Sequence, residues 1–196
     1  MDSHPGKSDD EPTIAAKAAN FVLFQTIYAA CVLGAARGHL WLGPAAGALL
    51  LPINLLFISR GRWFGEVRLW LIAGLIGWIV DSGLLALNVM AFPPITRIAP
   101  DAALSAWMVP PWIVILWLSV GTMLRTSLVW LREKPILAAG LGAVGGPFSF
   151  WSGARLGATE LPLGWLSLAL LGLEYAIVVP WLLRLAHPPL NKLEST

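Results

Sequence analysis

The sequence predicts an all-α fold, a polytopic bundle of about six transmembrane helices in a single domain. The chain has 196 residues, of which 57% are hydrophobic and only 12% are charged. A soluble globular domain contains about 25% charged residues, so this composition is typical of an integral membrane protein. The apolar residues also gather in segments of about 20 residues, the length that a helix needs to cross a bilayer.

Six such segments follow one another along the chain. Pro110 and Pro111 stand at the start of the fourth, which suits the first turn of a helix. The polar ends predict two cytoplasmic tails, a disordered one at 1–15 and a second at 187–196, around a single domain at 16–186. The expected spans are 16–36, 40–59, 69–92, 109–131, 135–152 and 162–185.

The basic residues predict how these spans are oriented. Six crossings place both termini on one side of the membrane, and loops rich in lysine and arginine stay in the cytoplasm. Only Arg37, Arg97 and Arg155 belong to the first, third and fifth connections. Both termini are therefore expected in the cytoplasm, because the terminal segments and the second and fourth connections hold Lys7, Lys17, Arg60, Arg62, Arg68, Arg125, Arg132, Lys134, Arg184 and Lys192.

The third segment carries an acid, Asp81, near the middle of its expected range. Placing a carboxylate at that depth costs about 2.5–3.5 kcal/mol on insertion scales, so it is expected to face the interior of the bundle or a wet cavity. Helical spacing supports this interpretation, because one small and polar face collects Trp70, Gly74, Gly77, Asp81, Leu84 and Asn88.

Other polar residues inside the spans form a candidate site around Asp81. Glu174 is expected at the same depth, and the two acids are the candidate acid–base or ion-binding groups. The candidate substrate-binding residues are Arg125, Gln25, Asn54, Asn88 and Ser82, with Arg125 as an anion anchor or counter-ion.

A structural interpretation of the same residues stays open. Arg125 is long enough to reach the cytoplasmic interface. Asp81 would then cap a helix or pair with Arg125, and Glu174 would be a neutral acid. The glycine-rich segment 142–147 has two interpretations, close helix packing or a broken helix that lines a substrate cavity.

Several classes of chemistry are excluded by what the chain lacks. One cysteine and three histidines, all three in termini or loops, cannot build a cysteine cage or a histidine-rich di-iron centre, so no metal and no cofactor are expected. There is no Gly-x-Ser-x-Gly motif for a serine hydrolase. No basic stripe supports binding of nucleic acid.

The chain resembles a family of small bacterial polytopic inner-membrane proteins known only as a domain of unknown function. The family often has Asn-His where this chain has Arg125-Thr126, so a family role that needs the histidine does not transfer. The resemblance covers most of 20–186 and rests on Asn20-Phe21, Phe24-Gln25, 31–37, Gly77-Trp78, Asp81-Ser82, Trp112, Leu116-Trp117, 127–131, 145–147 and 153–158.

The resemblance implies a location in the bacterial inner membrane and a connection with lipids. Genes of the family often neighbour genes for cyclopropane-type fatty-acid methyltransferases and flavin-dependent oxidases. Membrane lipid is therefore an expected partner, together with lipid-modifying enzymes. The first hypothesis is modification of membrane lipid or fatty acid around Asp81; the alternatives are a small proton-coupled transporter or flippase and a non-catalytic scaffold for partner enzymes.

Overall fold

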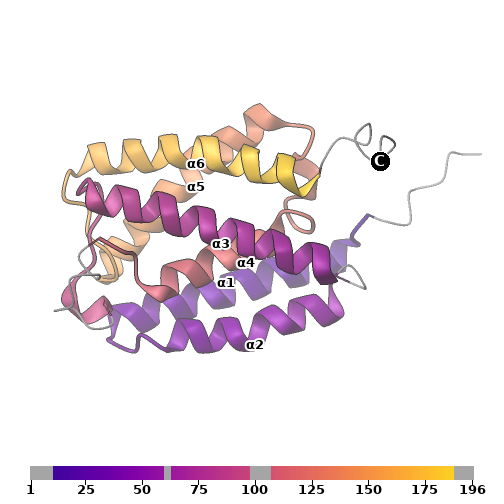
Figure 1. The fold of residues 1–196 in the computed structure, drawn as a ribbon, viewed down its shortest axis with the longest axis horizontal. Helices are drawn as coiled ribbons and strands as arrows, with labels where there is room; N and C mark the ends of the chain where they lie inside the picture. Colours follow the sequence, from indigo (N-terminus) through magenta and orange to yellow (C-terminus); the bar gives the residue numbers. More distant parts are fainter. Residues whose placement is uncertain (1–10, 60–62, 98–106, 188–196) are drawn as a thin grey trace, which may run out of the picture.

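The computed structural model describes residues 11–59, 63–97 and 107–187, and these fold into a bundle of helices that lie along one long axis (Figure 1). The all-α prediction is confirmed for these residues. Two single-turn 3₁₀ helices, η1 (Pro94–Thr96) and η3 (Val129–Leu131), lie in connections. The α-helices are α1 (Ile14–Ala36), α2 (Leu42–Phe57), α3 (Trp63–Ala86), α4 (Pro111–Met123), α5 (Pro135–Leu156) and α6 (Trp165–Ala186).

Consecutive helices pack as hairpins, α1 with α2, α3 with α4, and α5 with α6. The central helix is α4, which also packs against α1 and α2. The α5–α6 hairpin packs lightly on the rest, where α5 meets α1 and η3 and α6 meets α3 and Trp117 of α4 (Figure 1). This arrangement leaves room between the hairpin and the wall that α1 and α4 form.

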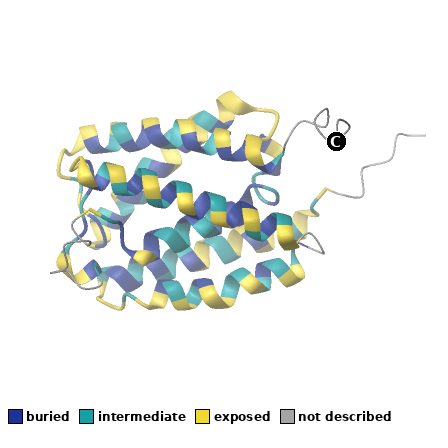
Figure 2. Ribbon diagram, viewed as in Figure 1, coloured by how far each residue is buried: buried dark blue, intermediate teal, exposed yellow. Residues whose placement is uncertain are grey.

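Exposed and buried residues alternate along every helix (Figure 2), and large apolar side chains are common among the exposed residues, whereas several polar side chains are buried within the apolar core. Phe64, Ile136 and Trp165 are each at least 85% exposed, whereas Asn20 and Asp81 are 0% exposed. Among the described residues, α1, α3 and α6 are long and apolar enough to cross a membrane, and α2 and α4 are shorter apolar helices. This pattern marks a membrane protein, because only a hydrocarbon surrounding favours an apolar outer surface.

Helix α3 begins and ends earlier than the predicted span 69–92. It already includes Trp63, the first described residue after 59, and Glu66, which hydropathy places in a loop, is buried beside Arg125 at a distance of 3.7 Å between Oε1 and a guanidinium nitrogen. It ends at Ala86 because Asn88 adopts the left-handed conformation, with φ of 57°. The Val89 N–H then bonds the Leu84 carbonyl at 2.9 Å, a Schellman ending. Asp81 therefore lies in the last two turns of its helix, not at the middle.

Helix α4 is much shorter than the predicted span 109–131. It ends at Met123, and the chain continues in turns, with the Leu128 N–H bonding the Met123 carbonyl at 2.8 Å, before η3 begins. A helix of 13 residues rises only about 20 Å, which is less than the thickness of a hydrocarbon core. Six membrane crossings therefore stay a prediction.

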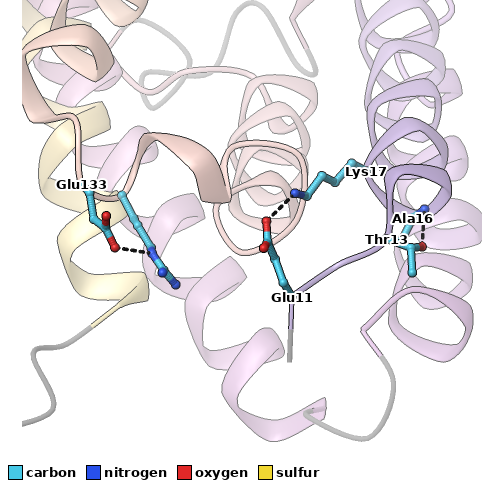
Figure 3. Close-up of polar contacts among 6 residues, drawn as sticks. Glu11, Thr13, Ala16, Lys17 and Glu133 are labelled. Carbon is cyan, nitrogen blue, oxygen red and sulfur yellow. Dashed lines mark hydrogen bonds and ion pairs between the residues drawn. The ribbon is translucent and has the colours of Figure 1, made fainter. Parts of the chain in front are cut away.

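The N-terminal end of α1 lies inside the predicted tail 1–15. Thr13 caps the helix by accepting a hydrogen bond from the Ala16 N–H at 3.2 Å, and Lys17 pairs with Glu11 at 2.8 Å (Figure 3). Beyond η3, the Arg132 Nε donates to Glu133 at 3.1 Å, also drawn in Figure 3. The remainder of that tail, 1–10, and almost all of the predicted tail 187–196 lie outside the described residues.

The contact between α3 and α4 predicts a sharp difference between two glycines of α3. A Cβ atom at Gly77 would lie 2.0 Å from Cγ of Trp117, so Gly77→Ala should lower the free energy of unfolding by about 1–3 kcal/mol through overpacking. The matched control is Gly83→Ala, because a Cβ there meets no atom within 4 Å among the described residues. It should leave stability unchanged or raise it by about 0.5–1 kcal/mol. Thermal unfolding midpoints in detergent would test both, and equal midpoints for the two variants would contradict the packing.

Candidate functional site

A cavity of about 270 Å³ lies between the α5–α6 hairpin and the wall of α1 and α4, with one residue from α3. Nearly all of its lining is aliphatic, aromatic or glycine, and its polar lining groups come from Asp81, Tyr28, Tyr175, Ser149 and Thr159. The volume is close to the lower end of the roughly 300–1,000 Å³ that is usual for small-molecule sites. The cavity is therefore an apolar chamber with a few polar groups.

One end of the cavity is closed by the connections between helices. Ala91 and Glu160 exchange two backbone hydrogen bonds, of 2.9 and 2.7 Å, which tie the loop after α3 to the loop after α5. Buried Thr159 donates to the Phe150 carbonyl at 3.1 Å, and Trp112 Nε1 donates to the Thr96 carbonyl at 3.1 Å. Trp112 and Thr159 both line the cavity, so these bonds hold its end wall in place.

Asp81 is the acid on the cavity wall. It is 0% exposed, and its Oδ2 accepts a hydrogen bond from Trp117 Nε1 at 2.7 Å. Its Oδ1 has no hydrogen-bond partner in the described part of the chain. A buried carboxyl oxygen without a partner costs free energy, so this atom is a natural place for a bound group or a proton.

Glu174 on α6 lies beside Asp81. The two carboxyl groups are close enough to interact electrostatically, although neither oxygen of Glu174 has a hydrogen bond of ordinary geometry with the described residues. Glu174 is 8% exposed. Two carboxylates this close in a region removed from water repel each other, and one proton relieves that repulsion. The prediction that the two acids lie at one level is consistent with this geometry.

Two stacked aromatic rings lie beside Asp81. Trp117 of α4 stacks on Tyr175 of α6 with ring centroids 5.1 Å apart. Each ring lies on a glycine, because a Cβ at Gly77 would be 2.0 Å from Trp117 and one at Gly146 would be 2.3 Å from Tyr175. The stack therefore bridges α3 and α5, and it fixes the indole N–H that donates to Asp81.

A second polar contact crosses the cavity between α1 and α5. The hydroxyl of Tyr28 lies 2.7 Å from the Ser152 hydroxyl and donates to the Ser149 carbonyl at 3.2 Å. Tyr28 of α1 and Ser149 of α5 both line the cavity. Hydroxyl groups thus supply polar surface where α1 meets α5, and a carboxyl group supplies it from α3.

The structure separates most of the predicted substrate-binding residues from Asp81. Arg125 contacts Glu66, and its Nε donates to the Ala186 carbonyl at 2.8 Å, so it anchors the end of α6 and is not the partner of Asp81. Asn54 is buried on α2 and accepts a hydrogen bond from Ser59 at 3.5 Å. Neither residue lines the cavity.

The other three predicted binding residues also have different surroundings. Gln25 is exposed on the outer face of α1, because its position falls outside the face that carries Asn20 and Ile27. Asn88 is exposed beyond the end of α3, so it does not share a helical face with Asp81. Ser82 accepts a hydrogen bond from the Val109 N–H at 3.2 Å, which holds the chain just before α4.

A polar cluster that sequence reasoning did not select joins α1 to the end of α4. Asn20 is 0% exposed, and its Nδ2 donates to Thr122 Oγ1 at 3.0 Å while its Oδ1 accepts from Ser127. Ser127 is also 3.0 Å from the Lys17 carbonyl. The spacing of residues along the helix could have identified Asn20, because it lies on the same face of α1 as Ile27 and Cys31, which are buried.

Trp117, Tyr175 and Tyr28 were also not selected as site residues. Aromatic residues are common throughout this apolar chain, so their type alone carries little information. Their importance comes from contacts between helices that are distant in sequence, 36 positions for Trp117 with Asp81 and 124 for Tyr28 with Ser152.

Fold and site together define an α-helical membrane protein with an acid pair at the wall of an internal apolar cavity. The chain belongs to the family DUF2878, described as a protein of unknown function, whose model matches residues 17–181. The comparisons with curated proteins and with solved structures gave no match. The expected membership in a family of unknown function is thus confirmed, and the site has to be interpreted from its own geometry.

The cluster around Asn20 predicts a measurable loss of stability. Thr122→Val keeps the shape of the side chain but removes the hydroxyl that accepts from Asn20 and donates to the Ser119 carbonyl. A buried amide then loses its best partner, so the free energy of unfolding should fall by about 1–3 kcal/mol. Thr122→Ser keeps the hydroxyl and is the matched control. Thermal unfolding in detergent would distinguish the two variants, and a valine variant as stable as the serine variant would contradict the bonding.

Proposed function

We propose that this protein takes part in modifying a membrane lipid or fatty acid by acid–base chemistry at Asp81 and Glu174. The observation that carries the proposal is the pair of adjacent carboxyl groups at the wall of an apolar cavity, with Asp81 lining it. An apolar cavity inside a membrane protein suits an apolar substrate, and a carboxyl pair can give or take one proton beside it.

The roles of the two acids follow from their surroundings. Trp117 holds Oδ2 of Asp81, which leaves Oδ1 as the atom that can exchange a proton with a bound molecule. Glu174 stands next to Asp81, so it can supply or store that proton without a second negative charge in the pair. Trp117 acts as a positioning residue, because it orients Asp81 through the indole N–H.

The same proposal includes a multi-pass topology in a bacterial inner membrane with both termini in the cytoplasm. The start of α1 and the end of α6 lie at one end of the bundle (Figure 1), beside the segment that follows α4. The basic residues of the sequence favour the cytoplasm for this end.

The lipid profile of cells tests the acid–base role. In a deletion strain, the amount of the lipid or fatty acid on which the protein acts should change, and wild-type protein should restore it. Asp81→Asn should restore little of it, because loss of an acid–base group lowers a rate by roughly a hundredfold or more. Whole-cell lipid mass spectrometry, with expression checked by blotting, would measure this.

The matched control is Glu133→Gln, which removes a carboxylate that is 78% exposed in the connection before α5. It should restore the wild-type profile. Full restoration by Asp81→Asn would refute a role for Asp81 and would favour a scaffold that binds partner enzymes. An identical profile in wild-type and deletion strains would refute lipid modification altogether.

A second function is favoured by the same carboxyl pair, because one exchangeable proton beside a cavity also suits a proton-coupled transporter or flippase. That function needs the cavity to open alternately to each side of the membrane. Proton flux into proteoliposomes that contain the wild-type protein but not Asp81→Asn would favour transport over lipid modification.

The topology gives a separate prediction. A fluorescent protein that matures only in the cytoplasm should be bright when fused after residue 196, and alkaline phosphatase fused there should be inactive. The reason is the excess of basic residues in the terminal segments and even-numbered connections. Active phosphatase at that position would mean an odd number of crossings or the opposite orientation.

A further inference from the structure

The cavity reaches the outer surface of the bundle through the wall that α5 forms. Leu141 and Gly145 line the cavity and are also exposed, Leu141 by 46%. They are one helical turn apart, so they lie on one face of α5. The opening is therefore on the side of the bundle, where the neighbouring exposed residues of α5, such as Val144 and Phe148, are apolar.

The cavity is elongated along the bundle. Its lining extends along α4 from Trp112 to Met123, a rise of about 16 Å. Because its lining residues follow nearly the whole of α4, we call this elongated cavity the slot. Leu128 and Leu131 line it near the end of α4, and Trp112 lines it at the opposite end.

We propose that this slot binds one hydrocarbon chain of a membrane lipid, which enters sideways from the bilayer past Leu141 and Gly145. The inference rests on the proposed function and names the class of its substrate. The apolar lining, the elongated shape and an opening in the apolar side of the bundle all match one flexible chain. A polar solute from water would meet this opening only after it had crossed hydrocarbon.

Bound in this way, the chain passes the polar groups of the site. Asp81 and Trp117 line the slot part of the way between its two ends, at the middle of α4. The Tyr28 hydroxyl lies on the wall that α1 forms. Asp81 would thus meet an interior position of the chain.

The experiment uses the full-length protein in phospholipid nanodiscs and photoreactive lipids that carry a diazirine in the chain. Three probes each carry a hydrocarbon chain but represent different classes of membrane lipid. They are a fatty acid, a phosphatidylcholine labelled in one acyl chain, and an isoprenoid alcohol. Mass spectrometry locates the adducts. With at least one probe, adducts are expected on residues that line the slot, such as Leu116 and Val120 of α4.

Two tryptophan variants of α5 test the route of entry. Gly145→Trp should reduce adducts inside the slot by at least about tenfold, because its side chain fills the opening. Gly140→Trp is the matched control: this glycine is on the same helix, a Cβ there meets no atom within 4 Å of the described chain, and it does not line the slot. It should change the adducts by less than about twofold.

Three results would overturn the proposal: adducts only on outward-facing residues, no adduct with any probe, or an equal loss in both tryptophan variants. If Gly145→Trp does not fold, Gly145→Leu replaces it as the variant that narrows the opening. The positions of the adducts on the wild-type protein test the binding site without any variant. Asp81→Asn separates this inference from the proposed function, because it should keep the adducts while the cellular lipid profile changes. If adducts form in the slot but the lipid profile of the deletion strain equals that of the wild type, lipid-chain binding is supported and the proposed acid–base function is refuted.

Discussion

The hydrogen bond from Trp117 to Asp81 is the interaction on which the rest of the site depends. It gives one oxygen of a fully buried carboxyl group a partner. The donating indole ring packs directly against Gly77 of α3, where a Cβ atom would clash with it. The same ring stacks on Tyr175, which in turn lies on Gly146 of α5. One contact thus sets the positions of the acid, the central helix and the α5–α6 hairpin relative to the cavity.

Polar contacts are concentrated at the places where helices must be held, and apolar surface covers the rest. At one end of the bundle, Asn20, Thr122 and Ser127 join α1 to the end of α4, and Arg125 joins that segment to α6. At the other end, paired loops and Trp112 close the cavity. Between these ends the α5–α6 hairpin packs lightly on α1, which is why an internal space remains there.

The class of the protein and the type of its elements were predictable because both depend on local properties. Long apolar segments predict helices wherever they occur, and the expected first and sixth spans agree with α1 and α6 to within a few residues. The errors have two kinds of cause. Glu66 lies within α3 because a distant residue, Arg125, pairs with it, whereas a local left-handed turn at Asn88 ends the helix early. The sequence analysis selected Gln25 of α1 as a binding residue, but Asn20 is the buried polar residue of that helix. The rotational position of a residue around the helix axis decides whether its side chain faces inward, and apolar composition on all sides hides that position.

The sequence by itself determined that this is an apolar, helical chain of a membrane protein and that its interior contains the acids Asp81 and Glu174. Composition and segment length suffice for that, because the hydrocarbon environment selects them residue by residue. Only the tertiary structure decided that the two acids stand side by side, that Arg125 pairs with Glu66, and that an apolar slot opens beside Asp81. These features depend on packing between helices far apart in the chain, and no local pattern encodes which of several polar residues will meet.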